Sequence, residues 1–474
     1  MDTKKLRQKI LDLAIRGKLV PQDPNDEPAS VLLERIRAEK EQLIKEGKIK
    51  RSKKSVASDT SHYENYELPQ GWAYATMSDI CTKIVDGDHN PPIAQKAESE
   101  YIMISSKNVV NDSIIHLDDV RHLSRDDFEL SNARTQVSKG DVLFTSVASL
   151  GRTCIYDLDY PITFQRSVTV ICTKIFNRYL KLFLDSPLYQ NYVGENARGT
   201  AQKGFYINQI SDSWVPIPPL NEQIRIVEKA QSLLDIVQII NYSKEETSNN
   251  IIALKSKILD LAISGKLVRQ DKSDEPAIEL LKRINPQYQP ADNRHYENVP
   301  YKVPEKWQWV TLSDISNYGE CINVPVSNIP EDSWILELED IEKDSGRLIK
   351  RMNKSKRNIN GVRHSFKKGD VLYSKLRTYL NKVLVADQDG YCTTEIIPIT
   401  CAQGIVPEYL CHVLRSRYYV DYTISLGYGV KMPRLGTADA LKSMIPVPPY
   451  EEQIRIVKSV NEIYHKLEQI SSEL

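Results

Sequence analysis

Residues 222–268 read EQIRIVEKAQSLLDIVQIINYSKEETSNNIIALKSKILDLAISGKLV, and both ends of this stretch occur a second time in the chain. The hexapeptide EQIRIV returns at 452–457, and the last twelve residues return, with one change, as KILDLAIRGKLV at 9–20. One helical unit is therefore intact in the middle of the 474-residue chain, and a second copy is divided between its two ends. Self-similarity of this kind predicts a duplicated architecture, here a circularly permuted repeat with pseudo-twofold symmetry.

Further repeated motifs define two modules between the helical segments. With the helical segments included, the copies lie 229 to 248 residues apart, which is close to half the chain. Between the motifs the two modules diverge, so a common frame should present a different surface in each. The recurring motifs are HYEN at 62–65 and 295–298, Trp72 and Trp307 before Ser-Asp-Ile at 78–80 and 313–315, KGDVL at 139–143 and 368–372, and VPIPPLNEQIRIV at 215–227 with IPVPPYEEQIRIV at 445–457.

The shared segments have the apolar spacing of coiled-coil helices, because apolar residues alternate at threes and fours. The polar stretch 242–250 predicts a turn, and Gly17 and Gly265 are expected to end helices. We expect two antiparallel helical hairpins or crossings, one central and one assembled from both termini; the alternative is that each stripe packs on its own module. The expected seam and partner-docking residues are Leu6, Ile10, Leu13, Val227, Leu234, Val237, Leu254, Ile258, Leu261, Val457, Val460, Tyr464 and Leu467.

Helix length suggests a ruler. A helix over 222–241 would span about 30 Å, and one turn of B-DNA is about 34 Å. Such a spacer would hold two modules one turn apart on duplex DNA, a ligand that is itself pseudo-twofold.

The modules themselves mix short β-rich runs such as DVLFTS and DVLYSK with turns, and a helix is expected around 176–195 and around 406–424. This pattern predicts two α/β (α+β) domains joined by long antiparallel helices. The expected divisions are 1–20 and 446–474 for the distal helical region, 21–61 for a charged helical segment or linker, 62–215 for the first domain, 216–268 for the central helical spacer, 269–294 for a linker and 295–445 for the second domain.

Composition limits the kind of protein this is. The chain has 63 basic and 63 acidic residues, so it is not a free-standing, non-specific nucleic-acid binder with a strong positive charge. Its seven cysteines form no C-x-x-C pair, which predicts reduced thiols and a cytoplasmic location. The polar start MDTKKLRQKI is not a signal peptide, and no apolar run approaches the ~18 residues of a membrane span.

Motifs for catalysis are missing from the sequence. It has no phosphate loop, no dinucleotide-binding glycine motif and no His/Cys cluster with metal-ligand spacing. Asn90-Pro91-Pro92-Ile93 is similar to the Asn-Pro-Pro-aromatic loop with which amino-methyltransferases hold a flipped base, but Ile93 replaces the stacking aromatic residue. We therefore expect a proline turn there. The acidic cluster 339–343 matches a nuclease carboxylate set only loosely, so a non-catalytic chain without its own cofactor is predicted.

Charge placement indicates where nucleic acid would bind. Residues 343–382 hold 13 Lys/Arg and two acidic residues, whereas the matching stretch 112–153 holds five basic and seven acidic residues. The loops 197–204 (ARGTAQKG) and 427–434 (GYGVKMPR) match at an offset of 230, either as structural turns or as backbone that approaches DNA closely. Tyr379 is expected either to stack on a base or to lie in the core. The predicted DNA-binding residues are Arg347, Lys350, Arg351, Lys354, Lys356, Arg357, Lys375, Arg377, Tyr379, Lys431 and Arg434, with Arg152, Arg166, Arg198, Gln202 and Lys203 in the first module.

With these motifs together, the chain resembles the DNA specificity subunit of type I restriction–modification enzymes. The resemblance is carried by the two PIPPL/PVPPY-x-EQIRIV segments, the two LDLAI-x-GKLV segments, the paired KGDVL, and GVKMPRLG with its counterpart ARGTAQKG. It covers essentially the whole chain, although the charged segment 21–61 departs from it.

The resemblance implies two target recognition domains, each reading one half of a bipartite, asymmetric double-stranded DNA target. It implies docking of two methyltransferase subunits, which use S-adenosylmethionine to methylate adenine, and of restriction motor–nuclease subunits, which use ATP and Mg²⁺. The chain itself would be non-catalytic. The alternative is a scaffold or inactivated specificity subunit that docks methyltransferase and reads no sequence.

Overall fold

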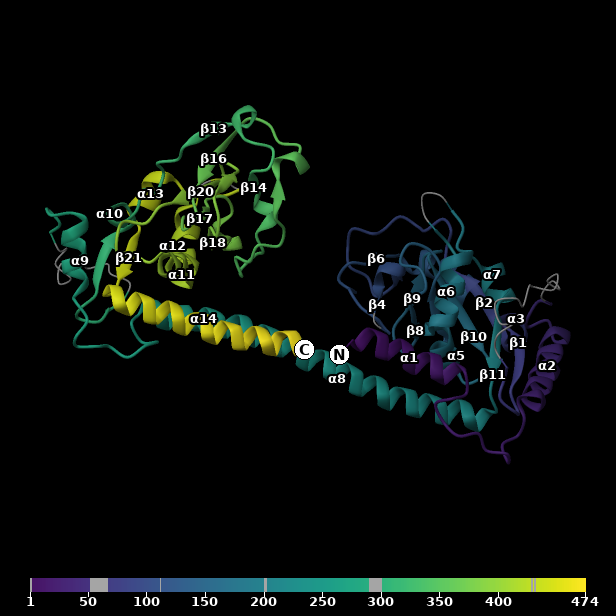
Figure 1. Cartoon of the computed structure of the whole chain (residues 1–474). Helices are drawn as coiled ribbons and strands as arrows, with labels where there is room; N and C mark the ends of the chain where they lie inside the picture. The colour runs from purple at the N-terminus through teal and green to yellow at the C-terminus, as the bar shows by residue number, and fades with distance from the viewer. Residues whose placement is uncertain are drawn as a thin grey trace. The chain divides into compact units, whose positions relative to one another are not determined.

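The computed structural model describes residues 2–51, 67–110, 112–199, 203–289, 301–427, 429 and 432–474. The chain divides into two compact units, Met1–Ser243 (unit 1) and Lys244–Leu474 (unit 2), which are described one at a time (Figure 1). Each unit contains a mixed α/β module, which confirms the predicted fold class. The HYEN motifs at 62–65 and 295–298 lie outside the described residues.

The central segment is one continuous helix, α8 (Leu220–Ile263), of 44 residues, and the boundary between the units falls inside it. The predicted turn at 242–250, and with it a central hairpin, is therefore wrong. The polar residues there include no glycine or proline, and Lys, Glu and Ser are compatible with a helix interior. Polarity marked a solvent-exposed part of the helix, not its end.

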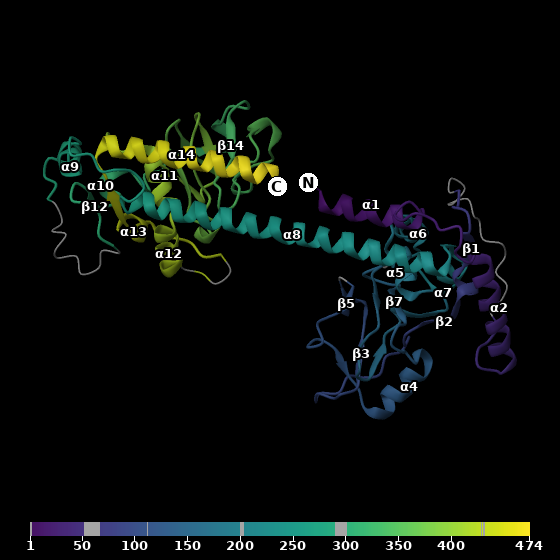
Figure 2. The ribbon, with the colours of Figure 1, turned by 90° about the horizontal axis from the view of Figure 1, so that it is seen from below.

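Each terminal helix packs antiparallel on its own half of α8 (Figure 2), and it also packs on the module of its own unit, which is the alternative that the sequence left open. In unit 1, α1 (Thr3–Ile15) begins beside Asn241, whose Oδ1 accepts a 3.1 Å hydrogen bond from Thr3 Oγ1. In unit 2, α14 (Tyr450–Glu473) lies along the second half of α8, and Tyr464 Oη donates to the Lys255 carbonyl at 2.9 Å.

The predicted seam is correct in part. Leu254 is 47% exposed, which contradicts its place in the seam, and Leu13 and Leu261 are only half-buried. These helices pack on the α/β module as well as on each other, so the buried face is wider than a two-helix seam. It includes Leu11, Ala14 and Ile15 in unit 1 and Leu259, Ala262 and Ile263 in unit 2. The seam residues that do join the cores are Leu6, Ile10, Val227, Leu234, Val237, Ile258, Val457, Val460, Tyr464 and Leu467.

Unit 1 is built on a four-stranded sheet with the order β2-β10-β7-β8 and a smaller sheet with the order β6-β3-β9. Its helices are α2 (Ala29–Lys45), α3 (Met77–Ile80), α4 (Arg125–Thr135), α5 (Asn177–Asp185), α6 (Pro187–Asn196) and α7 (Ile207–Asp212). Its strands are β1 (Ala73–Thr76), β2 (Cys81–Asp86), β3 (Ile102–Ile104), β4 (Val109–Val110), β5 (Ser113–Ile114), β6 (Arg121–His122), β7 (Val142–Thr145), β8 (Thr153–Ile155), β9 (Ile162–Phe164), β10 (Val168–Thr173) and β11 (Trp214–Ile217).

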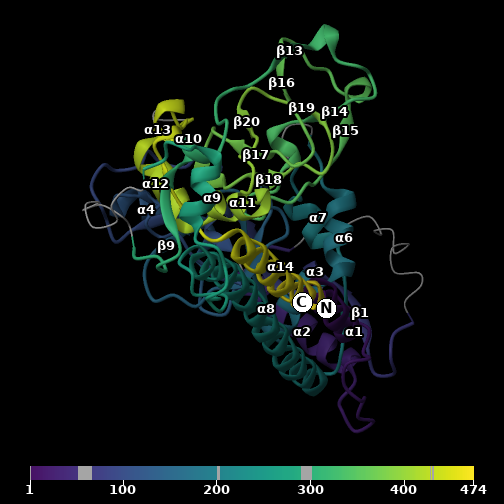
Figure 3. The ribbon, with the colours of Figure 1, turned by 60° about the vertical axis from the view of Figure 1, so that its left-hand side comes forward.

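Unit 2 repeats this plan with a five-stranded sheet, β13-β16-β19-β14-β15, and a three-stranded sheet, β18-β17-β20. The five-stranded sheet lies on the side of the unit away from α14 (Figures 1 and 3). The helices are α9 (Ala277–Ile284), α10 (Leu312–Ile315), α11 (Pro407–Arg415), α12 (Arg417–Leu426) and α13 (Thr437–Leu441). The strands are β12 (Gln308–Thr311), β13 (Asn323–Pro325), β14 (Trp334–Leu336), β15 (Met352–Asn353), β16 (Val362–Phe366), β17 (Val371–Ser374), β18 (Val383–Val385), β19 (Gly390–Cys392), β20 (Ile396–Ile399) and β21 (Met444–Val447).

The helix predicted before the last loop of each module is a pair of helices, α5–α6 and α11–α12. The break falls at Ser186 and Ser416, because each serine side chain accepts a hydrogen bond from the backbone three residues later and so starts a second helix. Gly17 and Gly265 have φ of 64° and 70°, which confirms that they end α1 and α8 in the left-handed conformation.

The repeated EQIR sequence attaches the helix to the module. In unit 1, the buried Glu222 accepts a 3.0 Å hydrogen bond from Trp72 Nε1, and Gln223 Oε1 accepts one from the Phe176 amide at the start of α5. Arg225 forms a 2.6 Å ion pair with Asp26. Unit 2 repeats all three contacts, with Trp307 to Glu452 at 3.0 Å, the Val406 amide to Gln453 at 2.8 Å and Arg455 to Asp274 at 2.5 Å. The same residues recur at these positions in both units because each of them makes a contact that attaches the helix to its module.

Candidate nucleic-acid interface

Three loops of unit 1 meet at the end of strand β7. They follow β7 (146–152), precede β10 (165–167) and follow α6 (197–199 and 203–205 of the described residues). The Ser146 amide donates to the Ser167 carbonyl at 2.9 Å, and the Phe205 amide donates to the Ser146 carbonyl at 2.8 Å. An antiparallel bridge joins Val147 to Gly204. We call this arrangement the loop surface of unit 1.

Unit 2 builds the same loop surface with different side chains. Lys375, at the end of β17, donates its amide to the Glu395 carbonyl at 3.0 Å and accepts from the Leu435 amide at 3.0 Å. An antiparallel bridge joins Leu376 to Arg434. These contacts repeat those of Ser146, Ser167, Phe205, Val147 and Gly204 at offsets of 228 to 230.

Both loop surfaces contain a residue with a strained backbone at the same place. Ala148 has a φ of 67° and Arg377, 229 positions later, has a φ of 50°. Left-handed conformation is costly for residues other than glycine and is concentrated at functional sites. Because the strain is retained in both units while the side chain changes from alanine to arginine, the loop shape is common and the surface chemistry is not.

The predicted basic residues of unit 1 lie on or beside its loop surface. Arg166 and Arg198 are exposed, and neither side chain has a hydrogen bond or an ion pair in the described part of the chain. Lys203 is likewise exposed, whereas Arg152 Nη1 donates to the Val109 carbonyl at 3.3 Å. Gln202 lies outside the described residues. Free guanidinium groups at a loop surface suit guanine edges or phosphates.

The loop surface of unit 2 combines an ion pair with unpaired cations. Two nitrogens of Arg434 donate hydrogen bonds to the Glu395 carboxylate, at 3.1 and 2.8 Å, and this contact lowers the pKa of the Glu395 carboxyl. Arg377 Nε is buried without an acceptor, and Lys375 has no ion pair, among the residues that the structure describes. Tyr379 is 44% exposed, so it is not a core tyrosine. Lys431 lies outside the described residues.

The basic stretch that stood out in the sequence lies largely in intramolecular contacts. Arg351 stacks 4.4 Å above the Trp334 ring and pairs with Asp387 at 2.6 Å. The acidic partners come from outside 343–382, so counting charge along the sequence could not find them. Lys350 and Lys356 are exposed and have no partner among the described residues. Three more of the predicted residues are paired: Arg347 with Glu342 at 2.9 Å, Lys354 with Glu331 at 2.9 Å, and Arg357 with the buried Asp340.

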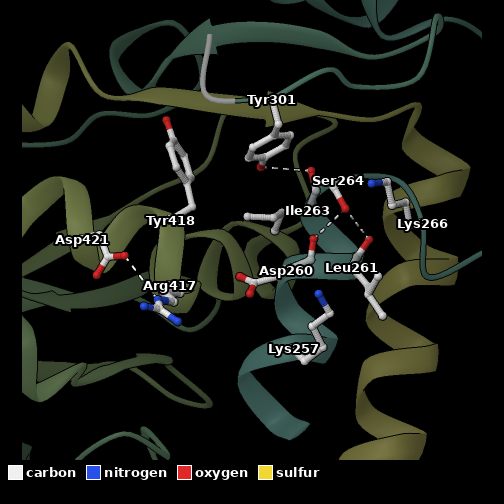
Figure 4. A pocket seen from close by; sticks show the side chains of 10 residues that line it. All are labelled: Lys257, Asp260, Leu261, Ile263, Ser264, Lys266, Tyr301, Arg417, Tyr418 and Asp421. Carbon is white, nitrogen blue, oxygen red and sulfur yellow. Dashed lines mark hydrogen bonds and ion pairs between the residues drawn. The ribbon is translucent and has the colours of Figure 1, made fainter. Parts of the chain in front are cut away.

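A pocket of about 360 Å³ lies elsewhere in unit 2, between the last turn of the α8 segment, Tyr301 and the start of α12 (Figure 4). Burial raises the pKa of Asp260 on its wall. The lining combines Lys257, Lys266 and Arg417 with Asp260 and Asp421, and Arg417 pairs with Asp421 at 3.4 Å. These charges offset one another, so the pocket lacks the single sign of charge that a phosphate site requires.

The described residues contain no group of three or more His, Cys, Asp or Glu side chains placed to hold a metal ion. The same residues contain no helix that is long and apolar enough to cross a membrane.

Comparison with known proteins agrees with the fold. Residues 69–248 match the family model described as "Type I restriction modification DNA specificity domain". The chain is 26% identical to the EcoEI specificity subunit of Escherichia coli, over 99% of this chain and 90% of that protein, and 26% identical to the EcoAI specificity subunit of Escherichia coli, over 97% and 88%. A solved chain of the type I restriction–modification system has a TM-score of 0.59 and 16% identity, covering 86% of this chain and 94% of that one, which shows a shared fold. The chain is therefore similar over nearly its whole length to type I restriction–modification specificity subunits, and residues 69–248 match the specificity domain of that family.

Proposed function

We propose that this chain is the non-catalytic subunit that selects the DNA target of a type I restriction–modification complex. In this proposal each unit reads one half of a bipartite, asymmetric duplex sequence. The observation that carries it is the pair of loop surfaces, which share backbone contacts and a strained residue but carry different cations: the exposed Arg166, Arg198 and Lys203 in unit 1 and the half-buried Lys375 and Arg377 in unit 2. A common frame with different side chains is what reading two different half-sites requires.

Two equivalent apolar positions support docking of two copies of one partner. Ile224 is 38% exposed and Ile454, 230 positions later, is 42% exposed; each follows the buried Glu-Gln pair of its helix. Leu220 and Tyr450 form a second equivalent pair, at 40% and 43% exposure. The support for a protein-binding surface comes from the repetition of these exposed apolar side chains at matched places in both units. The partners proposed are two methyltransferase subunits.

The cofactors of the proposed complex belong to those partners. S-adenosylmethionine would be used by the methyltransferase subunits to methylate adenine, and ATP with Mg²⁺ by restriction motor–nuclease subunits. The compartment would be the cytoplasm, where the DNA substrate and these cofactors are found.

The direct test is to co-express the chain with the neighbouring methyltransferase gene and map N6-methyladenine across the host genome. The expected result is methylation at a two-part motif with a fixed gap. A stable complex that creates no methylated motif would contradict target reading and favour the second candidate, a scaffold or inactivated specificity subunit. That candidate is supported by the intramolecular pairing of Arg351, Lys354 and Arg357, which leaves fewer free cations than the sequence suggested.

A second test concerns the docking positions. Ile224→Asp and Ile454→Asp should each reduce the number of bound methyltransferase subunits from two to one, and the double variant should bind none. Ile239→Asp is the matched control. Ile239 is 64% exposed on the same helix, but it lies far from the Glu-Gln pair and α14 has no equivalent isoleucine. Mass measurement of the complexes distinguishes these stoichiometries, and two bound subunits in the double variant would refute this docking surface.

A further inference from the structure

The loop that leaves strand β2 carries the most exposed large apolar side chain in the described part of the chain. Ile93 is 90% exposed and lies in the Asn90-Pro91-Pro92-Ile93 motif. Burying an isoleucine is worth roughly 1.5–3 kcal/mol relative to leaving it in water. Nearly all of this apolar area at Ile93 is therefore available for burial against a ligand.

The base of this loop is fixed to the loop surface of unit 1. The Asp88 amide donates to the Phe164 carbonyl at 2.7 Å, the Arg166 amide donates to the Asp88 carbonyl at 2.9 Å, and a parallel bridge joins Asp88 to Gln165. Gly87 is necessary for this approach, because a Cβ there would lie 2.2 Å from the Phe164 carbonyl oxygen. The loop is thus continuous with Arg166, one of the predicted DNA-binding residues.

The tip of the loop is also held in place. Asp88 accepts hydrogen bonds from the Asn90 amide at 2.9 Å and from Ser131 Oγ at 2.7 Å. Arg121 donates to the Pro92 carbonyl, and the two prolines fix their own φ angles. On the far side, the Gln95 amide donates to the His122 carbonyl at 2.9 Å. An isoleucine held out by such a loop is preorganised for contact, so ordering it on binding costs little.

The second unit also has an exposed isoleucine, Ile322, directly before strand β13. Ile322 is 69% exposed, and its carbonyl accepts from the Ser365 amide at 3.0 Å. Both units therefore carry an exposed isoleucine, although it follows strand β2 in unit 1 and precedes strand β13 in unit 2.

We propose that Ile93 is a specificity-determining residue that packs on the methyl group of a thymine in the half-site read by unit 1. The proposal rests on the proposed function, because it requires that the loop surface faces DNA. Apolar side chains recognise thymine through its C5-methyl group, and the other three bases lack that group. Since the methylated base would be an adenine, the half-site contains at least one thymine opposite it.

The test uses the purified complex with its methyltransferase subunits and the duplex target found by methylation mapping. Each thymine is replaced singly by uracil, which removes only the methyl group. Replacement of one particular thymine, in one half-site only, should weaken binding by the wild-type complex about fourfold. This factor corresponds to about 0.8 kcal/mol, the free energy of burying one carbon of the methyl type. In Ile93→Ala the same replacement should have no effect.

Leu130→Ala is the matched control, because Leu130 is 76% exposed on α4, beside Ser131, and should retain the uracil effect. The proposal would be overturned if uracil replacement changed the affinity of the wild type and of Ile93→Ala equally at every thymine, or changed neither affinity at any thymine. A loss of affinity in Ile93→Ala that is the same for every duplex would also overturn it. Failure of the proposed function is a separate result, in which the wild-type complex prefers no sequence at all.

Discussion

Gly87→Ala tests the close approach that positions the Ile93 loop. The new Cβ would lie 2.2 Å from the Phe164 carbonyl oxygen, whereas real Cβ contacts do not fall below 3.0 Å, so the two segments must separate. Separation strains three backbone hydrogen bonds, from the Gly87 amide to Val168, from the Asp88 amide to Phe164 and from the Arg166 amide to Asp88. At about 1 kcal/mol each, the expected loss in the stability of unit 1 is about 3 kcal/mol.

Two measurements check this expectation. Denaturant unfolding gives the stability of unit 1, and amide hydrogen exchange of peptides covering 82–95 and 160–170 reports whether these hydrogen bonds open. Gly194→Ala is the control, because Gly194 lies in α6 with no atom within 4 Å of an added Cβ, and alanine there should stabilise the helix by about 0.5–1 kcal/mol. Equal stability and equal exchange in the two variants would refute the reasoning.

Three further predictions concern the helix attachment, the spacer and the loop surface of unit 2. Burial raises the pKa of Glu222, so the folded state binds the proton of this carboxyl more tightly than the unfolded state does. The free energy of unfolding of the wild type should therefore rise relative to that of Glu222→Gln as the pH falls from 7 towards the ordinary carboxyl pKa of about 4.3. Unfolding measured at a series of pH values checks this. Seven helix-forming residues inserted between Ser243 and Lys244 should lengthen α8 by about 10.5 Å and widen the gap of the methylated motif by about three base pairs, and an unchanged gap would contradict the ruler. Lys375→Ala combined with Arg377→Ala should reduce the slope of log K against log salt by up to about 1.8, provided both contact phosphate, and an unaltered slope would show that neither does.

The fold was largely predictable because the two halves of the sequence repeat the segments that form its helices and modules. Period and composition indicated two α/β modules, long antiparallel helices, and helix ends at Gly17 and Gly265, all of which the structure contains. The turn at 242–250 was predicted wrongly because a solvated helix surface and a polar loop have the same composition. Tertiary context, which sequence pattern does not report, decides between them.

The candidate site was less predictable, for two physical reasons. The excess of basic residues in 343–382 indicated a DNA-binding face. However, Arg351 pairs with Asp387, which follows this stretch in the sequence, and Arg357 pairs with Asp340, which precedes it. Charge is summed in space and not along the chain. The loop surfaces, in turn, join residues such as Lys375, Glu395 and Leu435 through backbone hydrogen bonds, which leave no spacing signature in the sequence.

The division between constant and variable residues follows from how the two units are built. The Trp–Glu contact, the amide bond of Gln223 or Gln453 and the Arg–Asp pair set the position of each helix on its module, so a change there would displace the whole loop surface. The loop surface is held by backbone atoms, so its side chains can change without displacing it. A strained residue can be alanine at 148 and arginine at 377 for the same reason. In the proposed function, such a frame would allow one half of a target to change while the other half, and the docking of partner subunits, stay as they were.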